Sequence, residues 1–528
     1  MAKEFNVTGT CFPEDHYMAD MSKQLAQTYQ MIEAGKYFII NRPRQYGKTT
    51  TLYTMAERLT QSGNYLVFNM SFEGIGDDIF KHEAVFSAGF VRRLAKYAAV
   101  TAPELVDWLD ATAPTITSLE LLDKMITILV NKYDKKVVVF IDEVDKSSNN
   151  QLFVSFLAML RNKYLERKTF KTFHSIVLAG VHDIKSLKVK IRQGDEQKYN
   201  SPWNIATTFT VDMNLHPDEI KPMLEDYSQE KGITMDTQLI ADRLFYLTSG
   251  YPFLVSQMCK IIAEDILPKT GVKEWTVADV NKAFQLLIRH RGVANFDTVI
   301  KNLREYKDLY NLVYSLIIDG AVVPYNEHDF TTNLGILHGI FGRSESGALI
   351  IHNRIYREII ADMMISEWRT GNLIRPKHNT DEFDAISQYQ LPNKGLDMQK
   401  VLENFQIFMK KEYSGKNREF LERDGRLIFL AFMKPILNSA GYDFKEPQIS
   451  EEKRLDVVIT YYQHLYVAEL KIWRGPVAHE KGLGQLVDYL DRLGLDTGYL
   501  LIFDTNKKKK WDRDWVDVQG KRIFWVRV

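Results

Sequence analysis

The stretch YFIINRPRQYGKTT, residues 37–50, decides the fold of the first half of the chain. Its apolar start is typical of a short buried strand, and a helical pattern follows at residues 52–59. A strand, a loop ending in Gly47-Lys48-Thr49 and a helix form the context of a phosphate-binding loop, whose backbone N–H groups and helix N-terminus bind phosphate oxygens. We therefore expect Lys48 to reach the β- and γ-phosphates of a nucleotide and Thr49 to ligate Mg²⁺.

A second apolar run, residues 136–141, ends directly before Asp142 and Glu143. A continuous run of this kind suits a central parallel strand that is buried on both faces. We expect Asp142 to contact Mg²⁺, directly or through water, and Glu143 to polarise the attacking water as a catalytic residue. The nucleotide-binding residues expected are Arg44, Gln45, Tyr46, Gly47, Lys48, Thr49, Thr50 and Asp142, with Thr49 and Asp142 as the metal-binding residues among them.

Together, the two motifs resemble Walker A and Walker B of the AAA+ and STAND-like ATPases. The variant Arg-Pro-Arg-x-x-Gly-Lys-Thr at residues 42–49 resembles a prokaryotic AAA-ATPase-like family, whose members often carry a C-terminal PD-(D/E)XK nuclease domain. The usual loop opens with glycine, but Arg42 stands at this position, so we expect the loop to differ in shape there. The resemblance implies ATP as the ligand and Mg²⁺ as the cofactor.

The same resemblance implies an α/β fold: a P-loop NTPase parallel sheet with a helical lid and a winged-helix-like module, followed by an α/β PD-(D/E)XK nuclease fold. Apolar runs at 65–70, 175–180 and 209–211 predict further strands of the first sheet, and strands alternating with helices indicate a doubly wound arrangement. The expected domains are an ATPase core at 1–215, a helical lid at 216–300, the winged-helix-like module at 301–370, a linker at 371–400 and the nuclease-like domain at 401–528.

Other polar residues are candidates for the ATPase reaction. His182 and Asp183 follow the strand expected at 175–180, where AAA+ relatives place a polar sensor of the γ-phosphate. A catalytic arginine would favour phosphoryl transfer, and Arg161 and Arg192 are candidates. Each of these side chains has an ordinary alternative, as a turn residue or as a surface charge.

A β-hairpin is predicted near the C-terminus, where two apolar runs flank a polar turn between residues 455 and 471. Asp456 lies in the first strand, and Glu469 and Lys471 are two apart in the second, so they point to the same face. Two carboxylates facing one point can hold Mg²⁺ or Mn²⁺ through oxygen, and a lysine beside them can position a water or offset charge on a phosphate. Metal ligands at Asp456 and Glu469 and a catalytic Lys471 are therefore expected.

This spacing resembles the PD-(D/E)XK nuclease superfamily. In the helix that follows, Gln485 and Tyr489 match the Gln-x-x-x-Tyr signature of the recombination-nuclease branch, and residues four apart share a helix face. The resemblance implies that both take part in the catalytic site. It also implies an earlier acid, for which Glu422 is preferred to Glu419, both placed just upstream of a helix at 427–437. The alternative is a solvated charge pair on an ordinary hairpin.

Composition sets limits on the function. A chain of 528 residues is long enough for about two to four domains, and its net charge of zero provides no general attraction to nucleic acid. Two cysteines, Cys11 and Cys259, cannot form a disulfide framework, which suggests a reducing compartment. No apolar run approaches the roughly 18 residues of a membrane span. A cytoplasmic protein without a membrane partner is expected.

The leading hypothesis is an ATP-dependent or ATP-regulated nuclease that cleaves nucleic acid, with DNA preferred, in genome defence or mobile-element biology. The alternative is a nucleotide-driven assembly or signalling ATPase whose nuclease-like domain is a binding or inactive module. The segments 348–352 and 353–360 together suggest the winged-helix-like module of residues 301–370, and the phrase Asn353-Arg354-Ile355-Tyr356 also resembles the ATPase family. This module either packs on the ATPase or binds DNA, and a homo-oligomer remains open.

Overall fold

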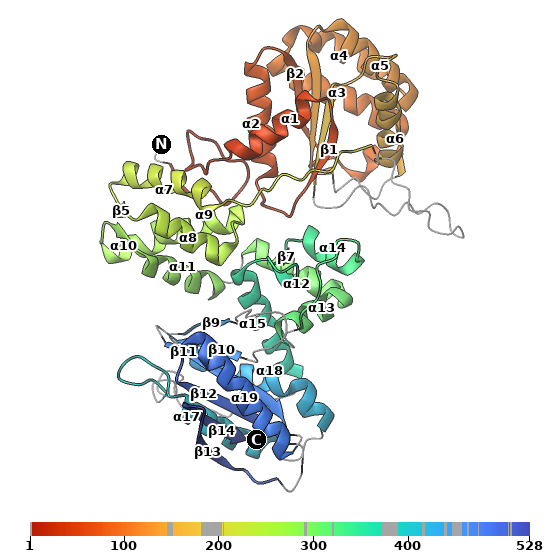
Figure 1. Ribbon diagram of the computed structural model, residues 1–528. Coiled ribbons are helices and arrows are strands. Elements are labelled where there is room, and N and C mark those ends of the chain that lie inside the picture. Colours follow the sequence, from red (N-terminus) through yellow and green to blue (C-terminus); the bar gives the residue numbers. More distant parts are fainter. Residues whose placement is uncertain are drawn as a thin grey trace, which may run out of the picture. The chain divides into compact units, whose positions relative to one another are not determined.

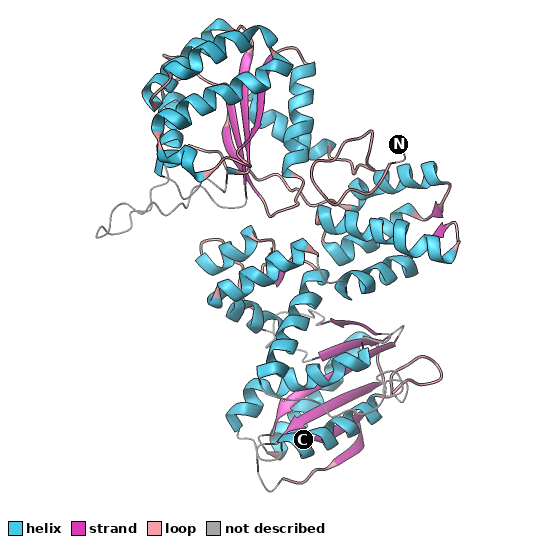
Figure 2. Ribbon diagram, turned by 180° about the vertical axis from the view of Figure 1, so that it is seen from behind, coloured by secondary structure: helices cyan, strands magenta, loops and turns pink. Residues whose placement is uncertain are grey.

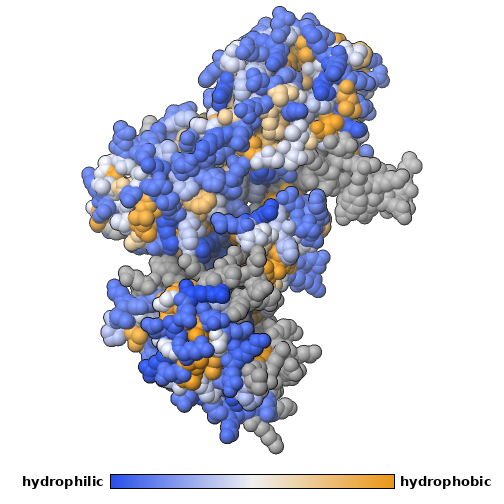
Figure 3. All heavy atoms as spheres, viewed as in Figure 1, coloured by the Kyte–Doolittle hydropathy of each residue, from blue (hydrophilic) through white to orange (hydrophobic). Residues whose placement is uncertain are grey.

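The computed structural model divides the chain into two compact units, Met1–Leu309 with Pro324–Tyr356 and Tyr310–Val323 with Arg357–Val528 (Figure 1). The structure describes residues 3–144, 151–180, 203, 205–289, 293–318, 321–371, 389–413, 418–437, 441–445, 457–461, 464–473, 475–504, 506 and 509–528. Hydrophilic residues dominate the face of the described parts shown in Figure 3. No helix in these ranges is both long and apolar enough to cross a bilayer.

The first unit contains a four-stranded parallel sheet in the order β1-β4-β3-β2. The strands are β1 (Tyr37–Asn41), β2 (Tyr65–Ser71), β3 (Lys136–Asp142) and β4 (Ser175–Gly180), as their apolar runs predict. The strand expected at 209–211 is wrong. At this edge Phe38 instead makes a single parallel bridge to Thr207, and the ring of Phe209 stacks on Phe38 with 5.7 Å between centroids.

Helices cover both faces of this sheet (Figure 2). The helices α3 (Glu83–Thr101), α5 (Leu119–Lys132) and α6 (Gln151–Leu165) share one apolar core with the sheet. On the other face lie α1 (Ser22–Glu33) and α2 (Lys48–Gln61), which contact each other and β4. The short helix α4 (Val106–Thr112) packs on α3. Because both faces are covered, the central residues of the strands are predominantly apolar.

A helical region follows the sheet. It comprises α7 (Pro217–Lys231), α8 (Thr237–Thr248), α9 (Pro252–Ile261), α10 (Leu267–Thr270) and α11 (Val277–Arg289), with a short parallel pair of β5 (Thr234–Met235) and β6 (Glu274–Trp275). Helix α7 begins where Pro217 predicts, and Glu219 accepts a 2.8 Å hydrogen bond from the backbone N–H of His216. Gly250 has φ +73°, and a Cβ atom there would lie 2.4 Å from the carbonyl oxygen of Leu215. Only glycine therefore fits this turn.

The remaining elements of the first unit are helices and a hairpin. They are α12 (Ala294–Glu305), α14 (Phe330–Leu337) and the antiparallel pair β7 (Phe341–Arg343) and β8 (Leu349–Ile351). Helix α13 (Lys307–Ile317) and helix α15 (Arg354–Gly371) each contain residues of both units. Helices followed by a small hairpin are compatible with the expected winged-helix-like module.

The second unit contains a six-stranded mixed sheet in the order β13-β14-β12-β11-β10-β9. The strands are β9 (Gly441–Lys445), β10 (Val457–Tyr461), β11 (His464–Ile472), β12 (Thr497–Phe503), β13 (Arg513–Val518) and β14 (Lys521–Arg527). Strands β10 and β11 form the predicted antiparallel hairpin, whereas β11, β12 and β14 are parallel neighbours. Helix α19 (Pro476–Leu493) is the crossover from β11 to β12.

Two further helices, α17 (Met398–Tyr413) and α18 (Arg418–Leu437), complete the second unit. The apolar residues of α19 pack with Leu500 and Ile502 of β12, whereas Phe405 of α17 lies 6.5 Å from the ring of Phe503, which points to the other face. Helices therefore cover both faces of the sheet. Helix α18 begins nine residues earlier than expected, so Glu419 and Glu422 lie within it rather than upstream of it.

Candidate functional site

The loop between β1 and α2 closes around the amine of Lys48. Gly47 precedes α2 with φ +75°, a left-handed conformation that glycine adopts without strain. Lys48 is 7% exposed, and its Nζ donates hydrogen bonds to the carbonyl oxygens of Arg42 (3.0 Å) and Pro43 (2.8 Å). The first amides of a 14-residue helix adjoin this loop. The loop thus presents an ammonium group and a helix N-terminus, both of which favour an anion.

Two oxygen-bearing side chains, one from the first turn of α2 and one from the end of β3, meet beside the loop. The hydroxyl of Thr49 donates a 2.6 Å hydrogen bond to Oδ2 of Asp142, a side chain that is 5% exposed. The other carboxylate oxygen accepts a 2.8 Å hydrogen bond from the backbone N–H of Glu143, whose φ is +56°. A hydroxyl and a carboxylate at this separation are the ligand types that Mg²⁺ prefers, so these residues fit the ion that the sequence implies.

Arg42, the departure from the usual loop, has a structural role. Its Nη2 donates a 2.8 Å hydrogen bond to the carbonyl oxygen of Val211, and its guanidinium lies 5.4 Å from the centre of the Phe209 ring. Burial lowers the pKa of this guanidinium. Beyond the single bridge at Thr207, the side chain of Arg42 thus holds the segment that leads from the sheet to the helical region.

Other loop residues contact the N-terminal arm and the helical region. The hydroxyl of Thr50 accepts a 3.1 Å hydrogen bond from the backbone N–H of Cys11. The backbone carbonyl of Arg44 accepts a 2.6 Å hydrogen bond from the hydroxyl of Tyr251, and burial raises the pKa of this tyrosine to about 12. The loop is therefore held from both sides by segments remote in sequence.

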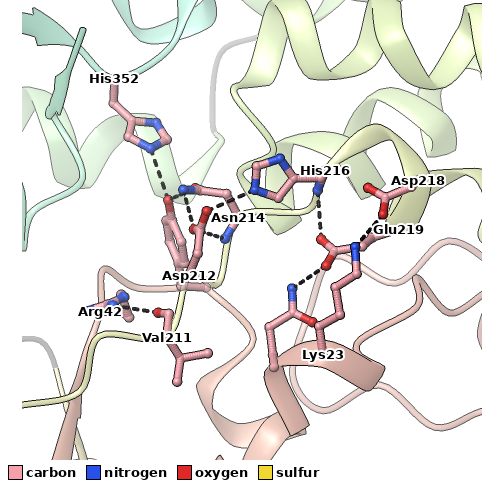
Figure 4. A network of polar contacts seen from close by, with 11 residues as sticks. Lys23, Arg42, Val211, Asp212, Asn214, His216, Asp218, Glu219 and His352 are labelled. Atoms are coloured by element: carbon pink, nitrogen blue, oxygen red, sulfur yellow. Dashed lines mark hydrogen bonds and ion pairs between the residues drawn. The ribbon is translucent and has the colours of Figure 1, made fainter. Parts of the chain in front are cut away.

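The side chains of Gln45 and Tyr46 are engaged by residues that the sequence did not reveal. The Tyr46 hydroxyl donates to Oδ1 of Asn214 and lies 3.1 Å from Nε2 of His352 (Figure 4). Oε1 of Gln45 accepts a 3.0 Å hydrogen bond from Nδ2 of Asn295. The phrase at 353–356 was the only sequence pattern that marked this region, because isolated polar residues carry no periodic signal.

A second polar group joins α1 to the start of α7 (Figure 4). Asp212 contacts Nε2 of His216 at 2.9 Å, and Glu219 accepts a 2.9 Å hydrogen bond from Gln24 of α1. Lys23, also in α1, forms an ion pair with Asp218. The connection between the sheet and the helical region is thus fixed by hydrogen bonds on both sides.

Of the remaining ATPase candidates, only Arg161 lies within the described residues. His182, Asp183 and Arg192 lie outside the described residues. Arg161 lies in α6, among helices that cover one face of the sheet. Their expected roles stay predictions.

In the second unit, Glu469 and Lys471 lie on one face of β11. Glu469 is 1% exposed, and Lys471 Nζ lies 2.6 Å from its Oε1. Val457, the residue after Asp456, pairs with Ala468, the residue before Glu469. Asp456 itself lies outside the described residues. Within the described ranges, no group of three or more His, Cys, Asp or Glu side chains could hold a metal ion.

Helix α19 covers the face of the sheet that carries Glu469 and Lys471. Tyr489 is buried and packs with Val458 and Val467 of the hairpin, and Gln485 lies one turn earlier and is half-buried. A pocket beside Lys471 has an empty volume of about 220 Å³, part of it open solvent, and is lined by Lys471, Ile472, Trp473, His479, Gly482, Leu500 and Ile502. The predicted helix thus packs on the hairpin.

Comparison with known proteins places the first unit in context. The model of the AAA-like domain family matches residues 13–276. The fold is similar to the Walker-type ATPase PABY2304 of Pyrococcus abyssi, with 11% identity, a TM-score of 0.44, and coverage of 67% of this chain and 99% of that chain. The Aeropyrum pernix ORC2 protein has 12% identity and a TM-score of 0.35, covering 66% and 93% of the two chains.

A further solved structure is the Holliday junction branch migration motor RuvB of Thermotoga maritima, with 15% identity, a TM-score of 0.33, and coverage of 67% of this chain and 98% of that one. No curated protein matches the chain. The family match covers the sheet, the phosphate loop and most of the helical region, and it ends before the second unit.

Proposed function

The chain belongs to the AAA-like domain family of P-loop ATPases, and from this premise we propose that it binds ATP with Mg²⁺ and hydrolyses it. The observation that carries the proposal is the 2.6 Å contact between Thr49 and Asp142 beside the loop of Lys48. Mg²⁺ would be held by these two oxygens and would offset the negative charge of the phosphates.

The chain's own residues supply the rest of the reaction. Lys48 exchanges its hydrogen bonds to the loop carbonyls for the β- and γ-phosphate oxygens, and the first amides of α2 bind the same phosphates. Glu143 accepts a proton from the attacking water, and its position next to Asp142 places it at the same strand end. Positioning and charge stabilisation account for most of the catalysis of phosphoryl transfer.

The test is steady-state ATP hydrolysis by the full chain and its Lys48→Ala variant. Loss of the ammonium group should lower turnover by about 100-fold or more, because it acts on the charge that develops in the transition state. The matched control is Lys124→Ala, which removes a lysine paired with Glu120 on the surface and should change turnover by less than about twofold. Equal turnover of wild type and Lys48→Ala would refute the proposal.

For the second unit we propose a metal-dependent nuclease, acting on nucleic acid with DNA as the preferred substrate. A specific observation favours it: a carboxylate that is 1% exposed is kept next to a lysine, on the face of β11 that α19 covers. Burying a charge costs free energy, and such groups are concentrated at functional sites. In the proposed reaction, Asp456 and Glu469 hold Mg²⁺ or Mn²⁺, and Lys471 positions the attacking water.

Helix α19 packs on the face of the hairpin that carries this proposed site. Tyr489 belongs to the apolar cluster that joins the helix to the hairpin, and Gln485, four residues earlier, shares its face of the helix. The test is cleavage of single- and double-stranded DNA and RNA, with and without ATP, by wild type and Asp456→Ala. If both cleave equally, the nuclease proposal fails.

ATP turnover with no cleavage of any substrate would favour the alternative, in which the second unit is a binding or inactive module. An arrangement in which ATP regulates cleavage predicts instead that Lys48→Ala changes the cleavage rate. Self-association of the full chain can be measured in the same experiments by sedimentation with and without ATP.

A further inference from the structure

A chain of hydrogen bonds leads from the phosphate loop to the start of α15. Nδ2 of Asn214 donates a 2.8 Å hydrogen bond to Asp212, so its Oδ1 is the atom that accepts the Tyr46 hydroxyl proton. The Tyr46 oxygen is then left to accept from Nε2 of His352, 3.1 Å away. This arrangement assigns the proton of His352 to Nε2.

The other ring nitrogen of His352 continues the chain. Its Nδ1 accepts from Nδ2 of Asn353 at 3.3 Å. The Oδ1 of Asn353 in turn accepts a 2.8 Å hydrogen bond from the backbone N–H of Tyr356, and Asn353 is 3% exposed. Asn353 thus caps the N-terminus of α15, because it satisfies an amide that has no partner within the helix.

A second chain of hydrogen bonds joins the same two regions. Nδ2 of Asn295 donates to Gln45 of the loop, and its Oδ1 accepts from the hydroxyl of Tyr356 in the first turn of α15. The ring of Tyr356 is 1% exposed and lies 5.7 Å from the ring of Tyr251, whose hydroxyl donates to the loop at Arg44. Leaving one polar group of a buried network without its partner costs free energy, so we expect the hydrogen bonds of this network to form or break together.

The phosphate loop also makes a close steric contact with the turn between α14 and β7. Gly339, between α14 and β7, has φ +72°, and a Cβ atom there would lie 2.9 Å from Cγ of Pro43 in the loop. Pro43 of the loop therefore lies against the turn that joins α14 to β7. Helix α15 begins with residues of the first unit and continues from Arg357 with residues of the second.

We propose that His352 and Asn295 are positioning residues of the ATPase, which hold the phosphate loop through Tyr46 and Gln45 and tie its nucleotide state to the first turn of α15. The inference rests on the proposed ATPase function and adds to it a route by which ATP affects the segment leading to the second unit. A nucleotide that draws Lys48 away from the carbonyls of Arg42 and Pro43 changes the loop, and the two hydrogen-bond chains carry that change to Asn353 and Tyr356.

The experiment uses the full chain as wild type, as the single variants His352→Leu, His352→Gln and Tyr46→Phe, as the double variant of His352→Leu with Tyr46→Phe, and as the control His328→Leu. Glutamine keeps a donor near the position of Nε2, whereas leucine removes it. His328 is an exposed histidine before α14, so its variant makes the same chemical change elsewhere. Two readouts are taken: hydrogen exchange of the α15 amides with and without Mg²⁺ and the non-hydrolysable analogue AMP-PNP, and kcat and KM for ATP.

In wild type and His328→Leu, AMP-PNP should slow exchange in the first turns of α15. In His352→Leu this difference should fall to about half or less and kcat/KM should fall about fivefold, the equivalent of one hydrogen bond. His352→Gln should recover both to within about twofold. Tyr46→Phe, which removes only one hydroxyl, should reproduce His352→Leu, and the double variant should be no worse than either single one.

The outcomes separate this inference from the function on which it rests. Unchanged exchange at α15 in a wild-type chain that hydrolyses ATP overturns the inference and leaves the ATPase proposal intact. If His352→Leu and Tyr46→Phe have the kinetic constants and the exchange differences of wild type, the inference is also overturned and the ATPase proposal is again unaffected. If wild type binds no nucleotide, both proposals fail.

Discussion

Thr49 and Asp142 are 93 positions apart in the sequence, and the hydroxyl of one lies 2.6 Å from the carboxylate of the other. The parallel sheet creates this contact, because Thr49 follows β1 and Asp142 ends β3, with β4 between the two strands. The carboxyl ends of parallel strands meet at one edge of a sheet, where ligands of such folds bind. The contact therefore follows from the order of the strands in the sheet.

Asp142→Asn should separate nucleotide binding from hydrolysis. The amide oxygen can still accept the hydrogen bond of Thr49, but it lacks the charge that favours Mg²⁺. Turnover should fall by about 100-fold or more, whereas affinity for ATP without Mg²⁺ should change by less than about threefold. The control is Asp134→Asn, at an exposed residue just before β3. Wild-type turnover in Asp142→Asn would exclude the assigned role.

The stability of the first unit should depend on His352 at mildly acid pH. The imidazole lies against Tyr46 and Tyr251, and its burial lowers the pKa of His352 to about 4, against a smaller opposing effect of Asp212. In the unfolded chain the pKa is about 6.5, so the unfolded state binds more protons between these values. The contribution of His352 to the free energy of unfolding should thus be fully present above about pH 6.5 and should be lost as the pH is lowered toward 4.

The measurement is denaturant unfolding at about pH 7 and pH 5, with His352→Gln as the comparison. The wild type should lose roughly 1–2 kcal/mol more than the variant over this interval, because glutamine does not titrate. Parallel stability profiles of the two proteins would contradict the assigned environment of His352.

Glu469→Gln should lower cleavage without lowering stability. The substitution removes the charge proposed to hold the metal, so cleavage should fall by about 100-fold or more. Burial of the carboxylate is itself costly, so the melting temperature should stay equal or rise. Glu480→Gln, at an exposed residue of α19, is the matched control. A lower melting temperature with full cleavage would instead assign Glu469 a structural role.

Two glycines on neighbouring elements of the second unit should respond in opposite ways. A Cβ atom at Gly498 of β12 would lie 2.8 Å from Leu490 and 3.2 Å from Leu486 of α19, so Gly498→Ala should cost about 1–2 kcal/mol of stability. A Cβ atom at Gly484 of α19 would meet no atom of a neighbouring element within 4 Å. Gly484→Ala should therefore raise the free energy of unfolding by about 0.5–1 kcal/mol. Thermal unfolding measures both, and an equal shift in the two variants would contradict the packing of α19 on β12.

The sequence predicted the parts of the fold that rest on local patterns. Apolar runs gave the four strands of the first sheet and the hairpin of β10 and β11, and Pro217 gave the start of α7. The strand expected at 209–211 failed because a buried apolar segment needs a partner, and Arg42 satisfies its carbonyl group with a side chain. Local composition does not contain that information.

Residues that act through long-range contacts were harder to find. Gln45 and Tyr46 were predicted as nucleotide-binding residues from their place in the loop, but their side chains contact Asn295, Asn214 and His352. These partners are up to 306 positions away in the sequence. Single polar residues show no periodicity, so only the three-dimensional structure reveals the contact.

The central claim is that the oxygens of Thr49 and Asp142 and the amine of Lys48 form one site for Mg²⁺ and ATP. Its most direct test is the rate of ATP hydrolysis by the full chain as Mg²⁺ is varied, in wild type and in Thr49→Val, which replaces the hydroxyl with a methyl group. We predict saturable dependence on Mg²⁺ in wild type and a rate at least about tenfold lower in Thr49→Val at the same Mg²⁺ concentration. Identical curves for the two proteins, or full hydrolysis in the presence of a chelator, would contradict it.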